Sequence, residues 1–173
     1  MKLKLFLLTS LLVFSCNNSD NQFISLYSFL PDESLVIVSI NNLDNTKEIF
    51  NKNNLLPGVI SSTQQISEQL SLLSKENSDK EGILSLSKYG KDEIAFTYIR
   101  KSNSFDSIQE DDILNKIYQK SEIFLEKTDD NNVHKVIINE YIVSSNKDII
   151  LENIIRDFYS KKSNLDSEFK KIL

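Results

Sequence analysis

The chain has 173 residues, and its 25 acidic and 20 basic side chains give a net charge of -5 at neutral pH. Nucleic-acid-binding proteins hold phosphates through Lys and Arg, so this acidic balance argues against that class. The single histidine, His134, excludes a metal site built from several histidines, and the single cysteine, Cys16, excludes an internal disulfide.

The N-terminal residues have the pattern of an export signal. Lys2 and Lys4 form a short positive region, which is followed by a mostly apolar segment over residues 5–14. The polar stretch CNNSDNQ begins too early for a membrane-spanning helix, which needs about 20 apolar residues. The order of these features predicts a signal peptide over residues 1–15.

The residues that end this signal resemble the lipobox of bacterial lipoproteins. In Val13-Phe14-Ser15-Cys16, an aliphatic residue, a tolerant position and a small residue precede a cysteine. The resemblance implies that Cys16 is lipidated, with palmitate among its acyl chains, and becomes the N-terminus of the mature protein. The alternative is a small buried thiol in a hydrophobic core, because free cysteine is among the most buried residue types.

A lipid anchor implies a location in the cell envelope. Removal of Lys2 and Lys4 with the signal leaves 18 basic side chains against 25 acidic ones, so the mature net charge is -7. Each buried methylene contributes about 0.8 kcal/mol, and the several acyl chains of a lipoprotein therefore hold it at a membrane. We expect the anchor to lie in a bacterial membrane, and we favour the outer membrane over the inner membrane. The remaining domain then lies outside the cytoplasm, where other envelope proteins are its candidate partners.

The mature chain starts with a polar tether and continues into an α+β domain. Residues 16–22 lack a hydrophobic period and predict a flexible tether, and residues 23–173 form the domain. The apolar run LVIVSI, residues 35–40, is typical of a central strand that is buried on both faces. Helical patterns follow over residues 43–52 and from residue 62 to residue 73.

The middle of the chain combines a hairpin with a helical pattern. Residues 83–87 and 93–99 have the pattern of strands, and the intervening KYGKD predicts a tight turn. Ser107 and Glu110 have the spacing of a capping box ahead of an apolar run. That spacing predicts a helix over residues 107–119.

The following sequence predicts further strands and a strong helix. Short connections between three strand-like runs predict an antiparallel meander. The runs are SEIFLEK (121–127), VHKVIIN (133–139) and YIVSS (141–145). Ile150, Ile154 and Phe158 then share one face of a helix that Ser145 and Asp148 cap. The domain is therefore an antiparallel sheet of about five to six strands flanked by amphipathic helices.

The final residues, LDSEFKKIL, start like another amphipathic helix and stop within about two turns. A helix that short is stable only when it packs on a partner. Two interpretations stay open: the chain is the N-terminal part of a longer protein, or it has a naturally frayed C-terminus.

The sequence contains few residues that could form a catalytic site. His134 is the one candidate general base, but a histidine beside a hairpin turn is more often a surface or structural residue. No serine lies in a G-x-S-x-G motif, and the glycines are too far apart to surround a phosphate. The acidic clusters at 110–112 and 129–130 lack the spacing of a calcium loop and fit a solvated helix start and a turn. We therefore expect no catalytic residue, no cofactor and no metal.

Two stretches of the chain resemble a known group of proteins. They are FLPDESLVIVSINNLDNTKEIFNKNNLLPG (29–58) and EYIVSSNKDIILENIIRDF (140–158). Both are similar to parts of an uncharacterised family of envelope lipoproteins of Bacteroidetes type, in which a Pro-Asp opening and a strand precede a helix capped by Ser-Ser. The resemblance implies that the chain is the first domain of a larger protein, and it carries over no catalytic or binding residue.

Two classes of function agree with these features. The first is a lipid-anchored binding or structural module, which acts through protein contacts or as a spacer that presents a further domain. The second is a periplasmic or surface enzyme, or a small-molecule binder, whose site lies beyond residue 173 or has no recognisable motif.

Metabolic labelling with a palmitate analogue tests the lipidation of Cys16. We expect the wild-type chain to carry the label, because the sulfur of Cys16 is acylated. The substitution Cys16→Ala removes that sulfur and should abolish the label. An unlabelled wild type would exclude the lipoprotein hypothesis.

Overall fold

The computed structural model describes most of the residues that follow the predicted tether. The described residues are 24–52, 67–68, 70–73, 81–91, 93–102, 108, 111–127 and 132–160. The predicted signal peptide over residues 1–15, the lipidation site Cys16, the tether over residues 16–22 and the stretch from residue 161 to residue 173 lie outside them.

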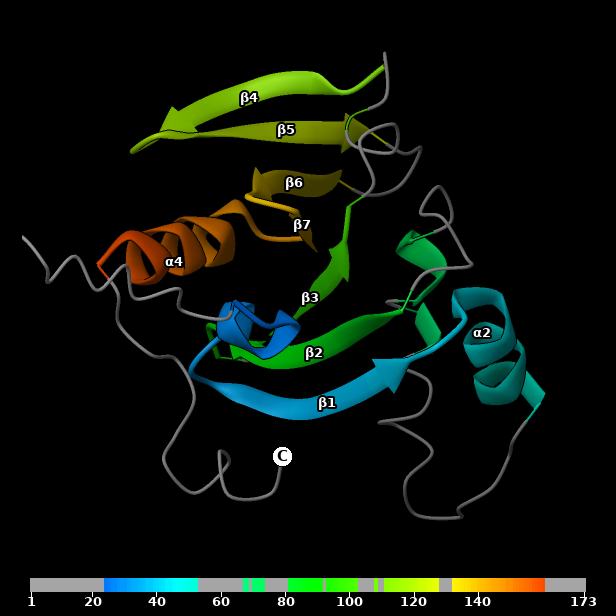
Figure 1. The fold of residues 1–173 in the computed structure, drawn as a ribbon. Coiled ribbons are helices and arrows are strands. Elements are labelled where there is room, and N and C mark those ends of the chain that lie inside the picture. Colours follow the sequence, from blue (N-terminus) through cyan, green and yellow to red (C-terminus); the bar gives the residue numbers. More distant parts are fainter. Residues whose placement is uncertain are drawn as a thin grey trace, which may run out of the picture.

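An antiparallel sheet of seven strands forms the centre of the fold. The strands are β1 (Ser34–Ile40), β2 (Gly82–Tyr89), β3 (Glu93–Lys101), β4 (Ile113–Tyr118), β5 (Ser121–Lys127), β6 (Asn132–Ile138) and β7 (Tyr141–Ser145). Their spatial order is β1-β2-β3-β7-β6-β5-β4, so two meanders join where β3 pairs with β7 (Figure 1). The predicted α+β class with an antiparallel sheet is confirmed. The predicted number of about five to six strands is wrong, because the sheet has seven.

Helical segments cover the two faces of this sheet. The 3-10 helix η1 (Leu26–Phe29) and the helix α4 (Asp148–Tyr159) pack on one face, where Phe29 contacts both Tyr141 and Phe158. The helix α2 (Leu43–Lys52) lies over the other face of the β1–β3 meander, together with the buried Leu70 and Leu73. No helix in the described part of the chain is both long enough and apolar enough to cross a membrane.

Alternation along the strands explains why two cores form. In β2, Ile83 contributes to the core beneath α4 and η1, whereas Leu84 and Leu86 contribute to the core beneath α2. Successive side chains of a strand point to opposite faces, so one apolar strand serves both cores. The helix α2 confirms the prediction for residues 43–52. A second helix is predicted from residue 62 to residue 73. Residues 67–68 and 70–72 of it are helical, and Leu73 forms a turn. The other residues of this predicted helix lie outside the described residues.

Residues 113–118 form the strand β4, so the predicted helix over residues 107–119 is wrong. The apolar residues of this segment fit one face of a helix as well as a strand, and local propensity is only a weak constraint. The strand pairs with β5 through a turn at Gln119, which has a positive φ of 52°. Its Lys116 also binds carboxylates of α4. These long-range contacts outweigh the local helical pattern.

The strand β1 forms where it was predicted, but its place in the sheet differs from the prediction. It lies at an edge of the sheet, and Leu35 is 65% exposed. Ile40 is the residue of β1 that is fully buried, so the predicted burial on both faces is wrong for this strand. A run of β-branched residues favours a strand, but it does not report how many strands lie beside it.

The last predicted helix is confirmed as α4, but its start differs from the prediction. The N-cap residue is Lys147, and no side-chain hydrogen bond caps the helix. Ser145 belongs to β7, where its hydroxyl donates a hydrogen bond to the backbone oxygen of Phe96 at 2.6 Å. Asp148 lies in the first turn of the helix and accepts a hydrogen bond from Lys116.

A close approach at the start of β2 depends on the absence of a side chain at Gly82. A Cβ atom at this position would lie 2.7 Å from the ring of Tyr98 and 2.9 Å from the backbone oxygen of Ile99. Both distances are shorter than normal van der Waals contacts, and the ring of Tyr98 is fully buried. Neither neighbour can therefore move without disturbing the core beneath α2.

We expect Gly82→Ala to lower the free energy of unfolding by about 1–3 kcal/mol, because the methyl group overpacks this core. Urea unfolding followed by circular dichroism measures the loss. Gly90→Asn is the matched control, since Gly90 has a φ of 62° with no atom within 4 Å of an added Cβ, and Asn tolerates that backbone conformation. Equal losses in the two variants would contradict the close approach at Gly82.

Candidate functional site

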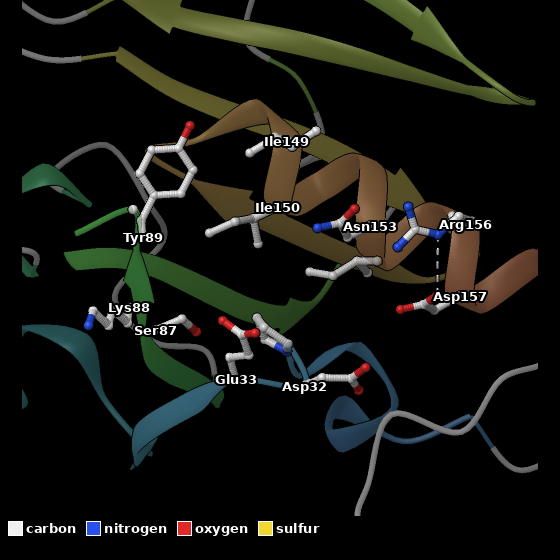
Figure 2. A pocket seen from close by; sticks show the side chains of 13 residues that line it. Asp32, Glu33, Ser87, Lys88, Tyr89, Ile149, Ile150, Asn153, Arg156 and Asp157 are labelled. Carbon is white, nitrogen blue, oxygen red and sulfur yellow. Dashed lines mark ion pairs between the residues drawn. The ribbon is translucent and has the colours of Figure 1, made fainter. Parts of the chain in front are cut away.

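A pocket of about 350 Å³ lies on the sheet face that carries α4 (Figure 2). Three chain segments line it: residues 31–33 before β1, residues 87–90 at the β2–β3 hairpin, and residues 149–157 of α4. Its volume is within the range of about 300–1,000 Å³ that is typical of small-molecule sites. The pocket is therefore the candidate functional site of the described residues.

Side-chain hydrogen bonds hold the segment before β1 against the sheet. The hydroxyl of Ser34 donates to the backbone oxygen of Pro31 at 2.7 Å, and the hydroxyl of Ser85 donates to the Ser34 oxygen at 2.8 Å. Pro31 also fixes its own φ angle, which restricts the turn that follows. Asp32 and Glu33 are thus presented at the margin of the pocket by a constrained turn.

The helix α4 supplies the apolar wall of the pocket. Ile150 and Ile154 are one helical turn apart, so both point to the sheet, and both are buried. Ile149, which is exposed, and the ring of Tyr89 lie closer to the opening, as Figure 2 shows. A ligand in this pocket would contact hydrocarbon on the side of the helix.

Two buried polar side chains line the same pocket. Ser87 is 3% exposed, and its hydroxyl has no hydrogen-bond partner. Asp157 is 7% exposed, and the Nε atom of Arg156 lies 3.6 Å from its Oδ1 atom. Figure 2 shows the Ser87 hydroxyl and the carboxylates of Glu33 and Asp157 directed into the pocket. A buried polar group without a partner is destabilising, so a ligand that binds these groups would recover that free energy.

A second polar cluster lies where β4 and β6 meet the first turns of α4. Lys116 donates a hydrogen bond to the Oδ2 atom of Asp148 at 2.6 Å and also binds Glu152. These hydrogen bonds raise the pKa of Lys116, and the bond from Lys116 lowers the pKa of Asp148. The cluster connects the edge strand β4 to the helix, which is a structural role.

The structure places His134 beside this second cluster and not in the pocket. Its Nδ1 atom is buried without a hydrogen-bond partner, and it does not line the pocket. Burial lowers the pKa of His134 below its ordinary value of 6.5, and the charge of Lys116 lowers it further, while Asp148 opposes both effects. Ser145 lies opposite His134 in the sheet, but its hydroxyl donates to the backbone oxygen of Phe96, so the half-buried histidine fits the structural role that its position in a strand predicts.

The acidic clusters of the sequence do not form a site in the described residues. Asp111 lies in a turn and Asp112 immediately precedes β4, so the predicted helix start is replaced by a strand start, and residues 129–130 lie outside the description. Within the described ranges, no group of three or more His, Cys, Asp and Glu residues is arranged to hold a metal ion.

The pocket could not be predicted from the sequence, because its residues come from distant segments of the chain. The two stretches compared with envelope lipoproteins, residues 29–58 and 140–158, supply the turn before β1 and the helix α4. The third segment, residues 87–90, has only the pattern of a hairpin in the sequence. The signal that could have indicated the site is Asp157, a charged residue one turn after Ile154 on the apolar side of the predicted helix.

Comparisons of the chain with protein-family models, with curated proteins and with solved structures give no match.

The lowered pKa of His134 predicts a decrease in stability at mildly acidic pH. The unfolded chain binds a proton near pH 6.5, whereas the folded chain binds it only at lower pH, so the folded state loses relative stability as the pH falls through that range. We expect the urea midpoint of the wild type to be lower at pH 5.5 than at pH 7.5.

His134→Gln removes the titrating group and should reduce this difference between the two midpoints. All other titrating groups are the same in the two proteins. A comparison of the urea midpoints of the wild type and the variant at both pH values therefore isolates the contribution of His134. A pH dependence that is equal in the two proteins would show that His134 is not its source.

Proposed function

We propose that the chain is a lipid-anchored protein of the bacterial cell envelope that acts as a non-catalytic binding module. The sequence of residues 1–16 supports the anchor, since a positive region, an apolar segment and Cys16 follow one another in the order of a lipoprotein signal. The pocket beneath α4 supports the binding role.

The observation that carries the binding role is the hydroxyl of Ser87. In a folded protein nearly all buried polar side chains have a hydrogen-bond partner, and an exception calls for a specific explanation. Ser87 is such an exception: its hydroxyl oxygen is buried without a partner, and the residue lines a pocket together with the largely buried Asp157. A ligand with polar groups would provide the missing partner.

The same observation favours binding over catalysis. A serine nucleophile is activated by a base that accepts a hydrogen bond from its hydroxyl. The hydroxyl of Ser87 makes no such bond, and His134 does not line the pocket. The arrangement offers contacts to a ligand and no activated nucleophile.

The start of the described chain also limits how far the pocket lies from an anchor at Cys16. The hydroxyl of Tyr141 donates a hydrogen bond to the backbone oxygen of Ile24 at 2.7 Å, which attaches this residue to the sheet. The chain between Cys16 and Ile24 spans at most about 28 Å when it is fully extended. A lipid on Cys16 would therefore keep the binding module close to the membrane surface.

A thermal-shift screen of the full chain in detergent tests the binding role. The panel contains small amines, carboxylates, sugars and aromatic compounds, and we expect at least one class to raise the unfolding temperature. A ligand at 100 times its Kd adds about 2.7 kcal/mol to the free energy of unfolding, which is well within detection.

Two serine variants show whether the shift comes from the pocket. Ser87→Leu removes the hydroxyl and fills part of the pocket, so it should abolish the shift. Ser39→Leu is the control, because Ser39 is exposed on β1 and does not line the pocket. The binding role is wrong if no class stabilises the wild type, or if Ser87→Leu responds as the wild type does.

A further inference from the structure

We propose that the pocket binds a protonated aliphatic amine, and that a linear diamine is the preferred form. This inference rests on the proposed binding function and names the class of ligand. The ammonium groups would be held by Glu33, Ser87 and Asp157, and the alkyl chain would lie against Ile150 and Ile154.

The charges that face the pocket are negative. The carboxylates of Glu33 and Asp157 are directed into it in Figure 2, whereas the amine of Lys88 is directed away. The position of Lys88 in β2 explains this direction, because neighbouring residues of a strand point to opposite faces and Ser87 already points into the pocket. Arg156 also lines the pocket, and its Nε atom lies 3.6 Å from the Oδ1 atom of Asp157, so it offsets part of the charge of that carboxylate. The lining as a whole has three carboxylates against the cations of Lys88 and Arg156, so its net negative charge favours a cation over an anion.

The hydrogen-bonding groups match an ammonium ion. An ammonium group has three N–H donors and no acceptor. No ion pair or hydrogen bond joins the carboxylate of Glu33 to another residue of the described ranges, and the buried hydroxyl of Ser87 has no hydrogen-bond partner. Figure 2 draws these two side chains on the same side of the pocket, and we place one ammonium group beside them.

The distribution of the carboxylates favours an organic cation over a metal ion. A metal ion needs several ligands around one point, and no such group occurs among the residues that the structure describes. Glu33 and Asp157 instead lie on different sides of the pocket in Figure 2, and the apolar side chains of Ile150 and Ile154 line the same pocket. Two separated charges with hydrocarbon between them are the complement of a diamine with a short alkyl chain.

Isothermal titration of the full chain in detergent with 1,5-diaminopentane tests this proposal. The comparison compounds are pentylamine, which lacks one ammonium group, 1,5-pentanediol, which is neutral, and glutarate, which has the opposite charges. We expect the diamine to bind at least about tenfold more tightly than pentylamine, since a charge-assisted hydrogen bond is lost with the second ammonium group. The diol and the dicarboxylate should not bind measurably.

Three carboxylate variants locate the binding site. Glu33→Gln and Asp157→Asn keep the size of each side chain and remove its charge, so each should weaken diamine binding at least about tenfold. Glu140→Gln is the matched control, because Glu140 is an exposed carboxylate that pairs with Lys101 far from the pocket lining. Circular dichroism verifies the fold of each variant. Because Glu33 is exposed and Asp157 is buried, Glu33→Gln tests the proposal even if Asp157→Asn does not fold.

The outcomes separate this inference from the binding function itself. If the diol or glutarate binds as well as the diamine, or if Glu33→Gln binds the diamine as tightly as Glu140→Gln, the amine proposal is overturned. If the amines fail and another compound class gives a shift that Ser87→Leu abolishes, the amine proposal is overturned and the binding function stands. If no compound binds, both are overturned.

Discussion

The pairing of β3 with β7 is the constraint on which the rest of the structure depends. Five residue pairs, from Thr97 opposite Ser145 to Lys101 opposite Tyr141, join the two meanders into one sheet. Side chains at the end of β7 reinforce this pairing. The hydroxyl of Ser145 donates to the backbone oxygen of Phe96, and the amide oxygen of Asn146 accepts from the backbone N–H of the same residue at 3.0 Å. Since α4 begins directly after these residues, the pairing also decides where the helix lies, and therefore where the pocket forms.

Local patterns were sufficient for most of the elements and insufficient for their arrangement. The hairpin around Gly90, the meander from β5 to β7 and the helix α4 follow from alternation, turn residues and a 3.6-residue period, all of which are local. The segment of β4 fits a helix and a strand equally well, and its pairing with β5 and the contacts of Lys116 decide between them. The edge position of β1 depends on the order of the strands, which no local pattern contains.

The candidate site was harder to predict than the fold for the same reason. Ser87 and Asp157 are ordinary residues of a strand and a helix in the sequence, and they become notable only when the β3–β7 pairing brings their elements together. His134, by contrast, attracted attention because it is the only histidine, and the structure places it beside Asp148 and Lys116 in a structural cluster. Rarity in a sequence is therefore a weaker guide to this site than the position of a residue in the pocket lining.

The hydrogen bond between Tyr141 and Ile24 has a mechanical consequence. If lipid chains hold Cys16 in a membrane, any pull on the folded domain enters it at Ile24, and the bond passes this force to β7 in the middle of the sheet. Edge strands open with small free energies, whereas central strands open only when much of the protein unfolds. The bond to β7 therefore lets its neighbours on both sides, β3 and β6, share a load that the backbone also carries through η1 to the edge strand β1. A pull at Ile24 would therefore act on the centre of the sheet as well as on its edge.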